Sequence, residues 1–243
     1  MKKAIVPILV SIILAITIVL VANIASDTAL NLQKKGFLRV KGFAKQAITS
    51  DMGFLEATIT TESSNLKTCY KKLAEDREKV KKFLKEKYSV TDKEYELRHA
   101  CIRNIYKRNA KGHTTTKLDK YILTQDLRVE SPDVHKITKV ASGLIDILGE
   151  GVKITIQRPE YIYTKLDDLK VEMIGRASTN ARERVKAVTQ KGKVRLGPIA
   201  AVRVGIFQIT PAYSTAISDY GINDTTTIEK EIKSVVEIKY FVR

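Results

Sequence analysis

The chain has 243 residues, of which 44% are hydrophobic and 29% are charged. These proportions are ordinary for globular proteins and exclude an intrinsically disordered chain. The formal net charge is +16, with 43 basic and 27 acidic residues. Two cysteines, Cys69 and Cys101, are too few for a disulfide framework and lack the spacing of metal ligands.

The first segment is an apolar run from Ala4 to Ala22, which contains no charged side chain and follows two lysines. At about 1.5 Å per residue, a helix of this length reaches about 30 Å, the thickness of the hydrocarbon core of a bilayer. The alternative is a cleaved signal peptide, but its apolar stretch is shorter, and the possible cleavage sites here are poor. We expect residues 1–26 to be a retained signal-anchor that crosses the membrane through residues 4–22, and residues 27–36 to be a linker.

The lysines before the apolar run orient the anchor. Lys2 and Lys3 should stay in the cytoplasm, which places the rest of the chain on the periplasmic or extracytoplasmic side of a bacterial inner membrane. Without these lysines the exported part keeps 41 basic and 27 acidic residues, a net charge of +14. This charge favours anionic surface polymer or lipid as a partner, and no nucleic acid is expected there. A solvated, lysine-rich surface explains the same charge without a partner.

Periodicity predicts the elements of the exported part. Alternating apolar residues predict strands at 37–48, 54–60, 97–106, 117–129, 152–163, 194–209 (broken at Gly197-Pro198) and 228–242. Apolar residues spaced three or four apart predict helices that begin at Ser63 or Ser64, at Ser131-Pro132 and at Thr164, where Asp167 completes a capping box. Cys69 falls early in the first helix and Cys101 in the strand returning from its far end, so we expect two buried thiols rather than a pair.

The order of these elements is ββα, ββα, βα, ββ. It predicts the α+β class, with a mostly antiparallel sheet, helices packed on one face and one preceding transmembrane helix. The last strand is the clearest, because its even positions are mostly apolar and its odd positions mostly charged. Ile232 and Ile238 should therefore be buried, and Glu231 and Glu237 should face solvent.

The familiar catalytic motifs are missing from the sequence. It contains no nucleotide-binding glycine loop, no HExxH, no GxSxG and no paired CxxC. His99, His113 and His135 have neither the spacing of metal ligands nor a nearby Ser or Cys partner. We therefore expect a protein that is not an enzyme, with no catalytic residue, cofactor or metal site, and a hydrolase is the least favoured interpretation.

The carboxy-terminal motifs resemble a known family. Residues 205–211 (GIFQITP), 218–225 (SDYGINDT) and 228–230 (IEK) are similar to the end of membrane-anchored members of the SIMPL-domain family. Other matching stretches are the helix around Ala177 and Ala181-Arg182-Glu183-Arg184, then Leu196-Gly197-Pro198, the Val40-Lys41-Gly42 strand, and the tyrosine-bearing strand Tyr121–Leu127. The resemblance covers residues 37–243 as one α+β domain. One departure is the lysine-rich first helix, where many members are alanine-rich.

The resemblance implies an envelope protein, often oligomeric, with no established catalytic activity and a loose association with envelope or oxidative stress. It implies no catalytic residues. Our leading interpretation is a membrane-anchored protein whose exported domain self-associates in a structural or stress-related role. The alternative is a binding module for anionic cell-surface polymer or lipid.

A long loop before the last strand provides the candidate contact. Residues 210–227 have no helix or strand pattern, and eighteen residues exceed the usual connection of about 2–6. The loop either packs on its own domain or forms a contact between subunits. The candidate oligomer-contact residues are Tyr213, Asp219, Tyr220, Ile222 and Asn223.

Overall fold

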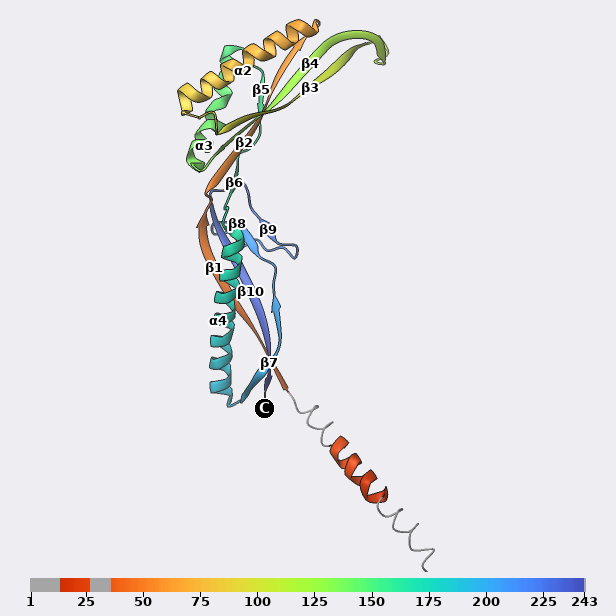
Figure 1. Cartoon of the computed structure of the whole chain (residues 1–243), viewed down its shortest axis with the longest axis vertical. Coiled ribbons are helices and arrows are strands. Elements are labelled where there is room, and N and C mark those ends of the chain that lie inside the picture. Colours follow the sequence, from red (N-terminus) through yellow and green to blue (C-terminus); the bar gives the residue numbers. More distant parts are fainter. Residues whose placement is uncertain (1–13, 27–35, 243) are drawn as a thin grey trace, which may run out of the picture. The chain divides into compact units, whose positions relative to one another are not determined.

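The computed structural model of the chain describes residues 14–26 and 36–242 (Figure 1). Residues 14–26 form a helix. The first part of the apolar run, residues 4–13, and nearly all of the expected linker at 27–36 lie outside the described residues. In the described ranges, no helix is both long enough and apolar enough to cross a membrane.

The folded part divides into two compact units. Of the described residues, the first comprises those up to Lys45, Lys170–Phe207 and those from Lys233 onward. The second comprises Gln46–Leu169 and Gln208–Ile232. The chain is α+β, but two sheets replace the one that the element order predicted.

One sheet belongs wholly to the second unit. Its strands are β2 (Met52–Ser63), β3 (Tyr95–Arg108), β4 (Thr114–Ser131), β5 (Ile154–Ile156) and β6 (Glu160–Ile162). Their order is β3-β4-β2-β5, with β6 also paired to β2, and the pairings are antiparallel. The helices of this unit are α2 (Leu66–Tyr88), α3 (Val134–Gly143) and the 3₁₀ helix η1 (Leu144–Glu150).

The core of this unit forms because alternate strand residues face the helices. Leu55, Ala57 and Ile59 of β2 are buried against the apolar stripes of α2 and α3, which include Leu73 and Ile137. Intervening positions such as Glu56 and Thr58 are only half-buried. The helices therefore cover one face of this sheet, as the periodicity predicted.

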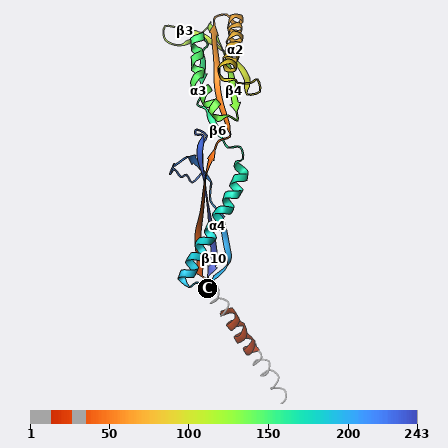
Figure 2. The ribbon, with the colours of Figure 1, turned by 90° about the vertical axis from the view of Figure 1, so that its left-hand side faces the viewer.

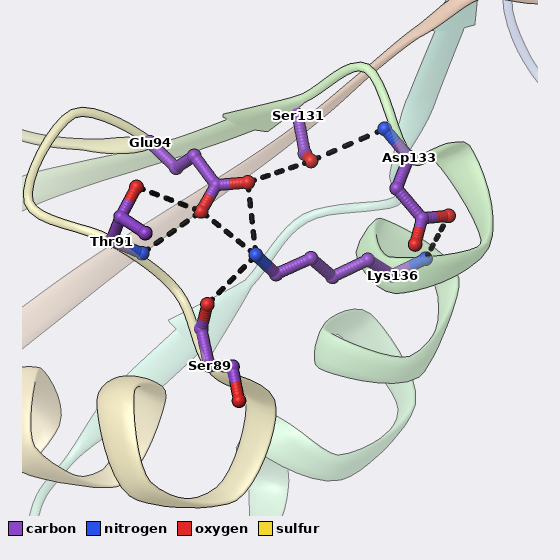
Figure 3. Close-up of polar contacts among 6 residues, drawn as sticks. All are labelled: Ser89, Thr91, Glu94, Ser131, Asp133 and Lys136. Atoms are coloured by element: carbon purple, nitrogen blue, oxygen red, sulfur yellow. Dashed lines mark hydrogen bonds and ion pairs between the residues drawn. The ribbon is translucent and has the colours of Figure 1, made fainter.

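A polar network joins the end of α2 to the start of β3, the end of β4 and α3 (Figure 3). The ammonium of Lys136 lies 2.7 Å and 2.9 Å from the two oxygens of Glu94 and donates to the carbonyl of Ser89 at 2.9 Å. Glu94 also accepts bonds from the backbone and hydroxyl of Thr91 and from Ser131. Burial opposes ionisation of Glu94, but these donors outweigh it and lower its pKa to about 2.

This network changes the expected helix starts. Ser131 does not cap α3, because its hydroxyl donates to Glu94; Asp133 caps the helix by accepting from His135 and Lys136. In α2 the cap is Asn65, which accepts from Thr68, rather than Ser63 or Ser64. In each case a short polar side chain in extended backbone caps the helix, as predicted, but the capping residue is Asn65 or Asp133 rather than a serine.

Thr164, the predicted first residue of a capping box, also contacts a segment far away in the sequence. Its backbone N–H and its hydroxyl both donate to the carboxylate of Asp51, at 2.7 Å and 2.8 Å. The helix that follows, α4, spans Leu166–Gly192. The predicted strand at 152–163 is interrupted and yields only the short strands β5 and β6.

The other sheet contains β1 (Gly36–Thr49), β7 (Leu196–Val204), β8 (Gln208–Pro211), β9 (Ile222–Asn223) and β10 (Glu229–Val242). The order is β1-β10-β8-β9, and β7 also pairs with β10. β7 runs antiparallel to β10, whereas β8 and β9 are parallel. The predicted strand at 194–209 breaks after Val204 rather than at Gly197-Pro198.

In the first unit, α4 packs along β1 and β10 (Figure 2). Gly42 lies against α4 so closely that a Cβ there would overlap the carbonyl oxygen of Ala177 and come within 2.6 Å of the Ala181 side chain. Asn180 accepts a bond from the backbone of Phe43 at 3.1 Å, and Arg184 donates to a β1 carbonyl. The small residues of the helix therefore allow a close strand contact.

The two cysteines do not form a disulfide. Cys69 is buried in α2, as expected, but Cys101 lies exposed on β3. The prediction of a second buried thiol was wrong, because both faces of this part of β3 are exposed. Strand alternation locates a side chain on a face but does not show whether that face is covered.

Candidate functional site

The candidate contact loop is shorter and more structured than its sequence indicated. Thr210 and Pro211 complete β8, and Ile222 and Asn223 form β9, where they pair with Gln208 and Ile209. The irregular part between these strands, residues 212–221, is called the tyrosine loop below. Strand β9 was missed because two residues are too few to show a period.

Local hydrogen bonds fix the tyrosine loop from the side of β8. The side-chain amide of Gln208 donates to the carbonyl of Ser218 at 2.7 Å, and its oxygen accepts from the backbone of Ser218 at 3.3 Å. The backbone of Ser214 donates to Pro211. Tyr213 has a φ of 63°, in the left-handed region that side chains other than glycine rarely adopt. The loop therefore has a defined conformation that holds its side chains outward.

The tyrosines do not pack the loop onto its own domain. Tyr213 is 99% exposed and Tyr220 is 97% exposed, and Asp219 between them is also exposed. In β9, Ile222 is half-buried and Asn223 is exposed. Ile217, which the sequence did not single out, adds a third large exposed side chain. Three of the five candidate residues therefore lie in the exposed loop, and the other two form β9.

Beside β9, a cavity of about 200 Å³ opens within the second unit. Its walls are formed mainly by apolar residues, with polar groups from β9, the following turn and β10. The lining residues are Ile48, Ile162, Tyr163, Leu166, Ile209, Asn223, Asp224 and Lys230.

Lys230 is the unusual member of this cavity. Its side chain is buried, with 2% exposure, and its ammonium donates to the carbonyl of Tyr161 at 2.5 Å. Burial lowers the pKa of Lys230, and the Asp224 charge partly offsets this effect. Burial would raise the pKa of Asp224, but bonds from Thr227 and Thr226 outweigh it and lower that pKa. Alternation placed Lys230 on the inner face of β10, but its partners come from distant segments.

Another exposed apolar surface lies on β7 in the first unit. Among the described strands, β7 pairs with β10 alone, which leaves its other edge open. Its large apolar residues project into solvent: Leu196, Ile199, Val202 and Val204. An open edge with apolar side chains is a ready site for pairing with another strand.

The described residues contain no group of three side chains that could hold a metal ion. His99 lies on β3, His113 at the turn before β4 and His135 on α3, and all three are exposed. The tyrosine loop and β7 each expose large apolar or aromatic side chains.

The comparison with known families agrees with the sequence motifs. Residues 38–240 match the family described as SIMPL: Protein of unknown function (DUF541). Because this match covers most of the chain, the protein belongs to the SIMPL family, which confirms the resemblance. No curated protein matches the chain.

Proposed function

We propose that the chain is a non-enzymatic, membrane-anchored envelope protein whose exported domain self-associates in a structural or stress-related role. Residues 4–22 would form a single span in the bacterial inner membrane, with the domain on the periplasmic side. The described part of this run is helical, and its apolar side chains, including Leu14, Ile18 and Val21, are exposed.

The observation that carries self-association is the open edge of β7. Among the described strands, one edge of this nine-residue, mostly apolar strand has no neighbour, and such an edge is a template for another chain that natural proteins usually protect. Arg203 is the single charged residue of β7. A second copy that covered this edge would satisfy its backbone groups and bury its apolar side chains. The tyrosine loop is a separate candidate contact, because aromatic residues are enriched at interfaces.

Light scattering on residues 27–243 tests this proposal. We expect an oligomer that Val202→Lys dissociates, because Val202 is 54% exposed on the open edge and an edge lysine opposes pairing. The matched control is Val171→Lys, since Val171 is 72% exposed on α4. Tyr213→Ala with Tyr220→Ala tests the loop separately. A monomeric protein at tens of micromolar would remove self-association, and equal effects of the two lysine variants would remove β7 as the contact.

A further inference from the structure

The outer half of the β3–β4 hairpin carries an unusual concentration of positive charge. Residues 103–118, called the basic ribbon below, include no acidic residue. Their five basic residues are Arg103, Lys107, Arg108, Lys111 and Lys117. Figure 1 shows this part of the hairpin extending without a helix against it, and nearly all its residues are exposed.

The cations of the basic ribbon differ from those nearer the sheet centre. Lys120 pairs with Glu62 at 2.6 Å, and Arg98 and Arg128 both reach Glu56. Within residues 14–26 and 36–242, none of the five ribbon side chains has an acidic partner. The ribbon therefore presents its charge to solvent rather than to its own domain.

The ribbon offers this charge on both strands and at a fixed tip. Arg103, Lys107 and Arg108 lie on β3 and Lys117 lies on β4, whereas Lys111 lies in the turn between them. At the tip, the side chain of Asn109 accepts bonds from the backbones of Lys111 and His113 at 3.0 Å and 2.9 Å. Gly112 has a φ of 80°, which completes this tight turn.

We propose that the basic ribbon binds a linear, phosphate- or carboxylate-bearing polymer of the cell surface. A flexible polyanion can follow cations that lie on both strands and in the turn, whereas a flat bilayer reaches one face or the tip. The tip, residues 109–113, also has no large apolar side chain to enter a bilayer. A second ribbon is excluded as the occupant because like charges repel. The choice of a surface polymer over nucleic acid rests on the proposed location outside the cytoplasm.

The test uses the full chain in non-ionic detergent micelles, with polyphosphate and polyglutamate as probes. The ribbon variant combines Lys107→Gln, Arg108→Gln and Lys111→Gln. The control combines Lys67→Gln, Lys72→Gln and Lys82→Gln, which removes the same charge from exposed positions of α2. We expect the ribbon variant to lose about tenfold in affinity and to show a weaker dependence on salt, and the control to change less than about twofold.

Three outcomes would overturn the ribbon site. They are no saturable binding to either polymer, equal losses in the two triple variants, and binding confined to vesicles that contain anionic lipid. Tighter binding to duplex DNA than to both polymers, lost in the ribbon variant, would instead identify nucleic acid as the partner and reject our choice. Light scattering on the same samples separates this test from self-association, because a monomer with ribbon-dependent binding fails only the earlier proposal.

Discussion

Glu94 accepts hydrogen bonds from several elements of the second unit. It accepts from Lys136, Ser131 and Thr91, and so joins β3 to α3 and to the ends of β4 and α2. Its side chain and that of Lys136 are each 19% exposed, so solvent screens the pair only weakly. Removing one partner leaves the other partly buried and uncompensated.

We expect Glu94→Gln to lower the free energy of unfolding by about 2–3 kcal/mol at pH 7. Because the folded pKa is about 2, against an ordinary value of 4.5, the ionised carboxylate stabilises the fold above pH 4.5. That contribution is lost as the pH falls from 4.5 toward 2. Urea unfolding across this range should show the difference between wild type and variant shrinking. Glu96→Gln, two residues further along the chain and largely exposed, should have little effect. A constant difference across the range would contradict the role of Glu94.

Gly42 provides a second prediction, in the first unit. We expect Gly42→Ala to destabilise the protein by more than about 3 kcal/mol, because the added Cβ would lie 2.5 Å from the backbone nitrogen of Ala181. The control is Gly175→Ala on α4, where a Cβ would meet nothing within 4 Å. That change should be neutral or gain up to about 1 kcal/mol from helix propensity. Thermal unfolding of both variants measures this difference, and similar melting temperatures would contradict the close packing.

At the level of elements, β10 shows how much strand alternation can predict. Ile232, Val236, Ile238 and Tyr240 are buried as expected, and Glu237 at an odd position reaches Arg39 at the surface. Alternation works here because one face of β10, along which α4 packs in the first unit (Figure 2), is buried, while the other face is more exposed.

Substitutions in β10 test this assignment. Ile232→Asp or Ile238→Asp should cost several kcal/mol, because each places a carboxylate among buried apolar groups without a partner. Glu237→Gln should cost less than about 1 kcal/mol, since it removes one surface ion pair. Chemical denaturation of each variant provides the comparison. Comparable losses for the buried and the surface change would show that the register is wrong.

Other elements could not be placed from the sequence alone. The cap of α3 lies at Asp133, because the hydroxyl of Ser131 donates to Glu94, and the cap of α2 lies at Asn65 rather than at either preceding serine. The length of the segment between the last strands predicted the tyrosine loop. The exposure of Tyr213 and Tyr220 depends on the bonds between the Gln208 side chain and Ser218 and on the left-handed backbone of Tyr213, which the sequence does not show. The lining of the cavity and the open edge of β7 depend on which strands become neighbours, which local periodicity does not specify.

For the whole molecule, local patterns predicted the class but not the number of sheets. Hairpins and helices fix which neighbours in the sequence pair, and the α+β assignment follows from them. The division into two sheets depends on long-range pairings such as that of β1 with β10. The charge shows the same limit. The net charge of +16 can be counted from the sequence, but the grouping of five cations without acidic partners on the β3–β4 hairpin is seen only in the fold.

The proposed anchor gives a prediction for the intact protein. We expect the full chain to sediment with membranes and to remain there in high salt, because residues 4–22 would insert in the hydrocarbon core. Protease added to spheroplasts should remove the domain. A chain without residues 1–26, expressed with a cleavable signal peptide, should appear in the periplasmic fraction. A domain protected from protease, or a mature amino terminus at Asn23 or Ser26, would contradict the retained anchor.

The contact of Gly42 with Ala177 and Ala181 also limits how this protein can evolve. That contact joins two stretches that carry the family resemblance, the Val40-Lys41-Gly42 strand and the alanine- and arginine-rich helix, which pack closely against each other. Gly42 cannot gain a Cβ without overlapping backbone atoms of Ala177 and Ala181, so a larger residue at position 42 requires the helix to move away from the strand. A chimera that takes one of them from a relative with larger residues at these positions should fail to fold until it receives the other.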